Sequence, residues 1–194
     1  MTNTALLVMD VQNGVVARHT EGMETLLATL GQALNAARSA GIPVIYARVA
    51  FRAGAPEVND RNRIFSSLAT YGGMKIDDPA TEIHPAVAPR PGDIVVIKKR
   101  VSAFTGSDLE IILRSLDVTA LVLTGITTSG VVLSTLRQAV DLDYSITVLR
   151  DGCADADPEV HRVLLDKVFS RQATVLMTDE WVNGLLAESS LSDL

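Results

Sequence analysis

The sequence predicts an α/β protein in which helices cover a six-stranded parallel sheet. Six short runs rich in Val, Ile and Leu recur along the chain, and the stretches between them mostly carry helical periodicity. The runs are continuously apolar rather than alternating, which is typical of strands buried on both faces. The clearest runs are residues 5–9, 42–47, 94–97 and 120–124, followed by two weaker ones at 145–149 and 173–177.

The helices in the first half of the chain are predicted from their boundary residues. Apolar residues within 23–37 fall on one stripe, and Gly41 ends this helix ahead of the second strand. Ser107 and Glu110 have the spacing of a capping box, in which each satisfies a free backbone N–H of the first turn. This spacing predicts another helix start.

The later helices have their own start signals. Ser129 is predicted to cap a helix that reaches about residue 140, a role we favour over that of a nucleophile because its surroundings are not Gly-x-Ser-x-Gly. Asp157 followed by Pro158 predicts an N-cap with proline in the first turn. A last helix is expected from Thr178 to about residue 187.

One long segment, residues 50–92, departs from this pattern. It holds five of the seven prolines, and we expect a single helix near 61–69 inside an irregular excursion. Such a segment in an α/β domain is typically a lid or an oligomer contact. No repeat or linker divides the chain, so residues 1–194 are interpreted as one domain.

Composition excludes several classes of function. The net charge is −6 and the pI is about 5.0, so a nucleic-acid partner is not expected. The only cysteine, Cys153, allows neither an internal disulfide nor a thiolate zinc site within one chain. The single cysteine fits a reducing cytoplasm. A signal peptide and a membrane span are not expected either.

Charged residues end two of the apolar runs. Asp10 directly follows the first and Lys98 the third, while Arg48 and the turn 125–131 follow the second and fourth. Because parallel sheets place ligands beyond the carboxyl ends of their strands, we expect these groups to form the site. An opposite-charge pair that is partly removed from water is suited to proton transfer, although a structural ion pair is the simpler interpretation of Asp10 alone.

The segments around these residues resemble one family. "LLVMDVQNG", "VIKKRVSAFTGSDLE" and "LTGITTSGVVLSTLRQA" are similar, in order and spacing, to the signature segments of the isochorismatase-like hydrolases, and "DGCADADPEVHRVLLDKVF" extends the match over essentially the whole chain. The resemblance implies a three-layer, Rossmann-like α/β sandwich, a homo-oligomer (dimer or tetramer), and a small-molecule substrate.

The same resemblance exposes a departure. Most members carry a nucleophilic cysteine six residues after the glycine of the third segment, and that position is Val131 here. Cys153 matches no catalytic position, so we interpret it as a buried structural thiol. Thioester chemistry is therefore not expected.

The resemblance leaves three functions open. Isochorismatases proper also lack the cysteine, which favours vinyl-ether hydrolysis with Asp10 as general acid and Lys98 as its electrostatic partner. Valine is bulkier than the small residue of those enzymes. The alternatives are a non-catalytic relative that binds a small anion or acts as a scaffold, and amide hydrolysis by water activated at Asp10.

Other family features predict the rest of the site. The turn resembles the family's cis-peptide segment, here Ile126–Thr127, and with Thr127, Thr128 and Val131 it is predicted to contact the substrate through backbone amides. Arg48 is predicted to bind an anionic group of the substrate, and Arg52 is a weaker candidate. The metal-binding Asp-x-His of nicotinamidase-type relatives is missing after the second strand, and no Gly-x-Gly-x-x-Gly follows the first, so neither a metal nor another cofactor is expected.

Overall fold

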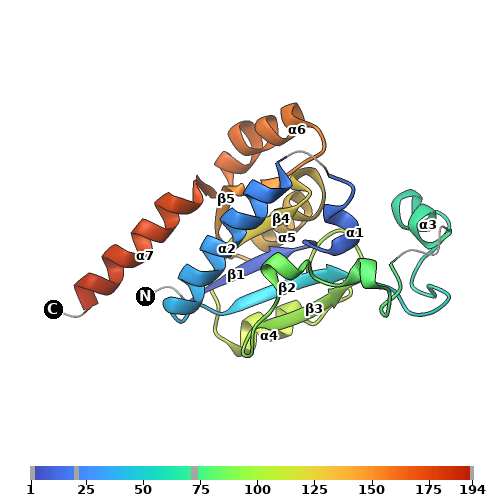
Figure 1. Ribbon diagram of the computed structural model, residues 1–194, viewed down its shortest axis with the longest axis horizontal. Coiled ribbons are helices and arrows are strands. Elements are labelled where there is room, and N and C mark those ends of the chain that lie inside the picture. The colour runs from blue at the N-terminus through green and yellow to red at the C-terminus, as the bar shows by residue number, and fades with distance from the viewer. Residues whose placement is uncertain (1–2, 20–21, 71–73, 193–194) are drawn as a thin grey trace.

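The computed structural model describes residues 3–19, 22–70 and 74–192 and confirms the predicted fold class (Figure 1). Its sheet has six strands in the order β3-β2-β1-β4-β5-β6, and every neighbouring pair is parallel. All six predicted runs are strands. They are β1 (Thr4–Met9), β2 (Val44–Val49), β3 (Ile94–Lys98), β4 (Ala120–Ile126), β5 (Ser145–Ala154) and β6 (Thr174–Leu176).

Helices cover both faces of the sheet, which explains the continuous apolar runs. Alternate residues of β1 enter opposite cores: Leu7 packs with residues of α4 (Leu109–Ser115) and α5 (Leu133–Asp141), and Leu6 packs with α2 (Met23–Ser39). Figure 1 shows α2 in front of the sheet and α4 and α5 behind it. Burying both faces removes a strand's apolar side chains from water, the main favourable contribution to folding.

The caps at two predicted helix starts differ from the prediction. A helix begins at Leu109, as predicted, and the Ser107 hydroxyl accepts from the Leu109 N–H at 3.3 Å while donating to the carbonyl of Ala103. The reciprocal half of the capping box was wrong, because Glu110 pairs with Arg114 instead. The helical stretch after β4 begins two residues earlier than predicted, as a π-turn η3 (Thr128–Val132). Its cap is Thr127, whose hydroxyl accepts from the Gly130 amide, and not Ser129.

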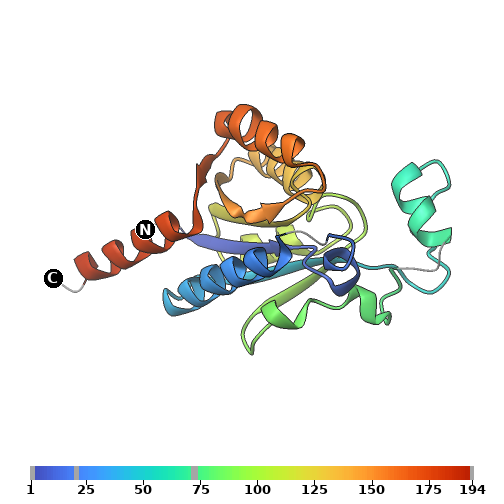
Figure 2. The same ribbon diagram turned by 45° about the horizontal axis from the view of Figure 1, so that its top comes forward.

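The other boundaries agree with the sequence or extend beyond it. Asp157 caps α6 (Pro158–Val163) by accepting from the amides of Glu159 and Val160. A further π-turn η4 (Leu164–Val168) and a short turn η5 (Phe169–Arg171) follow. α7 (Thr178–Ser192) is longer than predicted and extends away from the sheet in Figures 1 and 2.

The excursion 50–92 leaves the carboxyl end of β2 and returns to the amino end of β3, because the two strands are parallel. Its described residues contain one α-helix, α3 (Arg63–Thr70), and two short turns, η1 (Pro79–Thr81) and η2 (Pro85–Val87). A small cluster of Val49, Phe51, Phe65 and Met74 attaches it to the sheet. Figures 1 and 2 both show α3 standing off from the rest of the protein, at the end of the sheet where Asp10 follows β1. Within the described residues, no helix is long and apolar enough to cross a membrane.

Candidate active site

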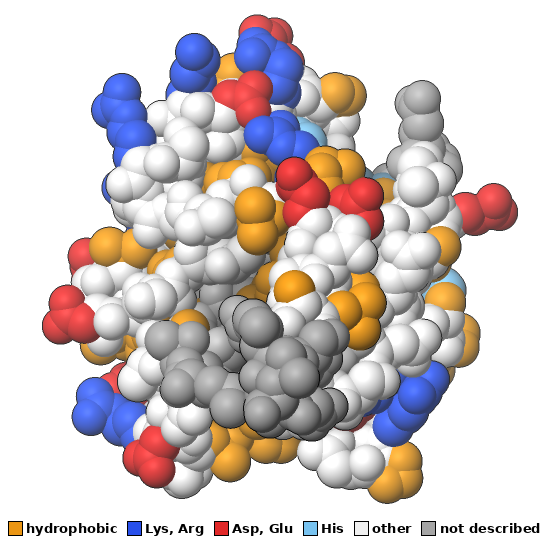
Figure 3. Space-filling view, turned by 90° about the vertical axis from the view of Figure 1, so that its left-hand side faces the viewer, with side chains coloured by type: hydrophobic (Ala, Val, Ile, Leu, Met, Phe, Trp, Pro, Cys, Tyr) orange, Lys and Arg blue, Asp and Glu red, His pale blue; other side chains and the backbone are white. Residues whose placement is uncertain are grey.

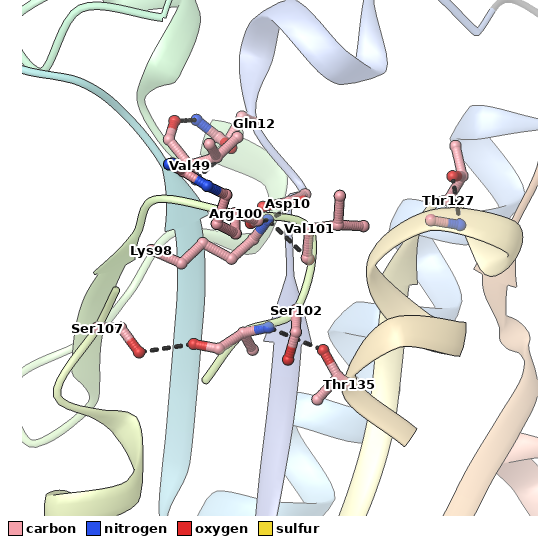
Figure 4. Close-up of polar contacts among 12 residues, drawn as sticks. Asp10, Gln12, Val49, Lys98, Arg100, Val101, Ser102, Ser107, Thr127 and Thr135 are labelled. Carbon is pink, nitrogen blue, oxygen red and sulfur yellow. Dashed lines mark hydrogen bonds and ion pairs between the residues drawn. The ribbon is translucent and has the colours of Figure 1, made fainter. Parts of the chain in front are cut away.

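Asp10 and Lys98 form an ion pair at the carboxyl edge of the sheet (Figure 4). Their strands are not neighbours, because β2 lies between β1 and β3. The long side chain of Lys98 reaches across the end of β2, and its Nζ lies 2.9 Å from Asp10 Oδ2. The side chain of Lys98 is 2% exposed and that of Asp10 is 11% exposed. The pair is therefore largely removed from water, as the sequence predicts.

Lys98 has a complete set of acceptors. Besides Asp10, its ammonium donates to the carbonyls of Arg100 at 2.9 Å and Val101 at 3.1 Å. An ammonium has three N–H groups, so each finds one acceptor. This arrangement fixes the cation and directs it at a single oxygen of Asp10.

The second carboxylate oxygen of Asp10 is different. Oδ1 is buried and has no hydrogen-bond partner within the part of the chain that the structure describes. Burial raises the pKa of Asp10, and the nearby Lys98 ammonium opposes this effect without reversing it. The carboxyl group therefore holds a proton more tightly than it would in water, and its carboxylate is a stronger base.

Gln12 fixes the backbone that carries Asp10. Its amide nitrogen donates to the carbonyls of Val49 and Thr81, and its amide oxygen accepts from the Val49 N–H at 3.0 Å. Gln12 is fully buried, so these bonds join the ends of β1 and β2 to the excursion. Sequence reasoning did not single out Gln12. Its position two residues after Asp10 was the only signal.

The turn after β4 begins beside Asp10. Gly125 pairs with Met9 in the sheet, and a Cβ at residue 125 would collide with the Met9 carbonyl oxygen, so glycine is required for this approach. The Ile126–Thr127 peptide is cis, as predicted from the resemblance. The hydroxyl of Thr128 is fully buried and lies 2.7 Å from Nδ1 of His161. His161 is a second residue that the sequence did not place in the site.

Val131 and Cys153 both belong to the apolar core behind this turn. Val131 is 2% exposed and Cys153 5% exposed, and both pack into the cluster that also contains Met9 and Leu123. Burial raises the pKa of the Cys153 thiol to about 12, so the thiolate is almost absent at neutral pH. This confirms that Cys153 is buried. It lies on β5, opposite Gly125.

Three cations from β2, the excursion and the end of β3 have one carboxylate partner between them within the described part of the chain. The Arg48 guanidinium donates from Nη1 to the carbonyl and hydroxyl oxygens of Thr81, and no ion pair joins it to a carboxylate among the described residues. Arg52 and Lys99 share one carboxylate, that of Glu57, at 2.6 and 3.8 Å. The positive charge of these three side chains is therefore only partly offset by Glu57.

Two other features of the described residues lie outside this acid–base site. Within residues 3–19, 22–70 and 74–192, no group of three or more His, Cys, Asp or Glu side chains could hold a metal ion. A cavity of about 830 Å³ opens at the opposite, amino ends of the strands beside Trp181, the end that Figure 3 faces. Neither Asp10 nor Lys98 lines that cavity, so it does not belong to the acid–base site.

A parallel α/β sheet with a largely desolvated ion pair at its carboxyl edge is typical of α/β proteins that bind small molecules beyond the ends of their strands. Comparison with known proteins gives the family. The model of the Isochorismatase domain matches residues 4–180, and the chain belongs to this family of hydrolases.

Two relatives and one solved structure illustrate the match. The chain is 33% identical over 184 residues to the ureidoacrylate amidohydrolase RutB of Stutzerimonas stutzeri, covering 81% of this chain and 72% of that protein. It is 30% identical over 174 residues to the N-carbamoylsarcosine amidase of an Arthrobacter species, covering 89% and 66%. A cysteine hydrolase from Pseudomonas syringae pv. phaseolicola shares the fold, with a TM-score of 0.87 at 24% identity over 95% of this chain and 93% of that one.

These findings confirm the predicted family. That Val131 stands in the place of the nucleophilic cysteine is tested neither by the family match nor by the relatives, and it stays a prediction. The same holds for the roles of Asp10, Lys98, Arg48, Thr127 and Thr128.

Proposed function

We propose that this protein hydrolyses a C–N bond of a small amide, carbamoyl or ureido compound, using water activated at Asp10 in place of a thiol. The observation that carries the proposal is the buried Oδ1 of Asp10, which has no hydrogen-bond donor among the described residues. A buried acceptor without a partner costs about 1–3 kcal/mol, so a ligand or water that donates to it binds favourably. Both relatives named above are amide-cleaving enzymes, which favours this substrate class over others.

The proposed reaction runs in two proton transfers. Asp10 takes a proton from water as the water oxygen attacks the carbonyl carbon, and a tetrahedral oxyanion forms. The protonated Asp10 then gives this proton to the leaving nitrogen as the C–N bond breaks. Lys98 holds the other oxygen of Asp10 throughout, and the raised pKa of Asp10 makes its carboxylate a better proton acceptor than an exposed aspartate.

Binding of the substrate is assigned to the residues around the pair. Backbone amides of Thr127, Thr128 and Val131 are proposed to face the carbonyl oxygen, since donors placed where negative charge develops stabilise the transition state. Arg48 is proposed to bind a carboxylate at the other end of the substrate, because its guanidinium has no carboxylate partner in the described chain. The substrate is therefore expected to be anionic.

Vinyl-ether hydrolysis is the second candidate. It needs Asp10 in its protonated form, and the raised pKa of Asp10 favours that form. An anionic substrate near Lys98 would raise this pKa further by offsetting the ammonium charge. Release of pyruvate from isochorismate would identify this reaction.

One substrate panel separates these candidates. Purified protein is incubated with N-carbamoyl amino acids, ureido acids, primary amides and isochorismate, and the release of ammonia, amine and pyruvate is measured with Asp10→Asn as the matched control. Turnover of an amide or ureido compound that is lost in Asp10→Asn is the expected result. Pyruvate release alone would overturn the C–N assignment. Binding of these anions without turnover would favour the non-catalytic alternative. A cytoplasmic location and a homo-oligomer remain sequence-based predictions.

A further inference from the structure

Two side chains from the segment after β5 hold two consecutive residues of the turn after β4. Asp155 Oδ2 accepts from the backbone N–H of Ser129 at 2.7 Å. His161 Nδ1 lies 2.7 Å from the hydroxyl oxygen of Thr128. Thr128 and Ser129 follow the cis peptide directly, so these contacts act on the turn that begins beside Asp10.

The His161 ring contacts the turn through the buried hydroxyl of Thr128. It is half-buried on α6, whose first turn is fixed by Asp157. Desolvation lowers the pKa of His161, Arg150 lowers it further, and Asp155 and Asp166 oppose these effects. The ring is therefore neutral at pH 7 and carries one N–H donor and one acceptor nitrogen.

We propose that His161 is a positioning residue for the reaction: with Asp155 it fixes the backbone of Thr128 and Ser129, and through them the amides that face the substrate carbonyl. This inference rests on the proposed function only in its last step, because the hydrogen bonds that hold the turn exist without substrate. The buried hydroxyl of Thr128 connects His161 to the backbone of the turn. It has His161 as its partner, and a misplaced turn would leave the oxyanion without well-directed donors.

The position of Nδ1 gives the proposal a sharp test. An asparagine side chain can place a polar atom near where Nδ1 of a histidine lies, whereas a glutamine reaches about as far as Nε2. His161→Asn is thus expected to keep the bond to Thr128, and His161→Gln to lose it. His84 supplies a matched control, since its Nδ1 accepts from Ala86 N–H in a separate exposed turn.

Two measurements are made on wild type, His161→Asn, His161→Gln and His84→Asn. The first is amide hydrogen exchange at residues 128–132, which needs no substrate. The second is kcat and KM on whichever substrate the panel identifies. We expect exchange to accelerate at least tenfold in His161→Gln only, and kcat to fall about 10- to 100-fold there with KM changed less than about threefold.

The outcomes distinguish this inference from the proposed function. If no substrate in the panel turns over, the exchange measurement decides alone: faster exchange in His161→Gln with rescue in His161→Asn supports the positioning role. Unchanged exchange in His161→Gln overturns it. Equal loss in both His161 variants, or loss through KM alone, overturns it as well, because either shows that His161 acts other than by holding Thr128.

Discussion

Lys98 Nζ lies 2.9 Å from Asp10 Oδ2 although an entire strand, β2, separates the strands that carry the two residues. The contact is possible because Asp10 adopts a positive φ of 55° directly after β1, while Lys98 ends β3 and extends over the end of β2. Two opposite charges thus share a site from which water is largely excluded, and each depends on the other to remain charged there.

Removing Lys98 is expected to damage both stability and activity. In Lys98→Met, Asp10 would lose its buried counter-ion, so the free energy of unfolding should fall by about 3–5 kcal/mol at pH 7. Urea unfolding at pH 7 measures this change. Arg114→Met is the control, since Arg114 belongs to an exposed pair with Glu110, and its effect should stay below about 1 kcal/mol. A loss in Lys98→Met no larger than this control would show that the pair does not stabilise Asp10.

The pH dependence of the rate separates the two chemical roles of Asp10. Its pKa lies above the usual value, so its ionisation falls at higher pH than for an exposed aspartate. If Asp10 is the base in amide hydrolysis, kcat/KM rises as pH increases through this pKa. If Asp10 is the acid in vinyl-ether cleavage, kcat/KM falls over the same range. The measurement is a pH–rate profile of the wild type, and the corresponding limb should be absent from the residual rate of Asp10→Asn.

The raised pKa of Asp10 also makes the free energy of unfolding depend on pH. Between the unfolded and the raised folded pKa of Asp10, the native state binds more protons than the unfolded state. Stability contributed by protonated Asp10 is therefore present below its unfolded pKa and is lost as pH rises through its folded pKa. Asp10→Asn should remove this loss. The check is to measure the unfolding free energies of wild type and Asp10→Asn across this pH range. The stability of the wild type relative to Asp10→Asn should fall as pH rises, and a relative stability that increases with pH would contradict the prediction.

The sequence predicted the fold well because its strands are buried on both faces. Each continuous apolar run is a strand, and the charges that end the first and third runs do meet. β5 runs five residues beyond its predicted end at residue 149. The prediction ended too early because Arg150 and Asp151 interrupt the apolar pattern. In the structure these two residues pair with Asp166 and Thr178. Polar side chains that find partners from other elements do not reveal a strand.

The same reason explains what was missed in the site. Gln12 bonds to the backbone of Val49 and Thr81, which lie 37 and 69 positions further along the chain. His161 bonds to the hydroxyl of Thr128, 33 positions before it. Such partners are created by the fold and leave no local periodicity. Asp10 and Lys98 were recognisable from the sequence because a charged residue directly after an apolar run is unusual without a functional or structural role.

Cys153 is expected to be dispensable for any hydrolysis. Its pKa of about 12 and its burial in the core should make it react slowly with iodoacetamide at pH 7.5. Turnover should survive this treatment, and Cys153→Ala should keep turnover within about threefold while losing roughly 1 kcal/mol of stability from the smaller side chain. Mass spectrometry of the alkylated protein provides the check. Loss of turnover in step with alkylation of a folded protein would place the thiol in the reaction.

Returning a thiol to position 131 tests whether Val131 occupies the nucleophile's place. In Val131→Cys, made in the Cys153→Ala background, the new sulfur would replace a buried branched side chain of similar size at the turn beside Asp10, so the fold should tolerate it. If position 131 is the nucleophile's place, this thiol should face the acid–base pair and react with iodoacetamide at least tenfold faster at pH 7.5 than Cys153 does in the wild type, because a nearby ammonium favours a thiolate. Any amide hydrolysis of this variant should then become sensitive to alkylation, whereas that of Cys153→Ala alone should not. An alkylation rate as slow as that of Cys153 would show that residue 131 faces the core only, and the missing-nucleophile interpretation would fail.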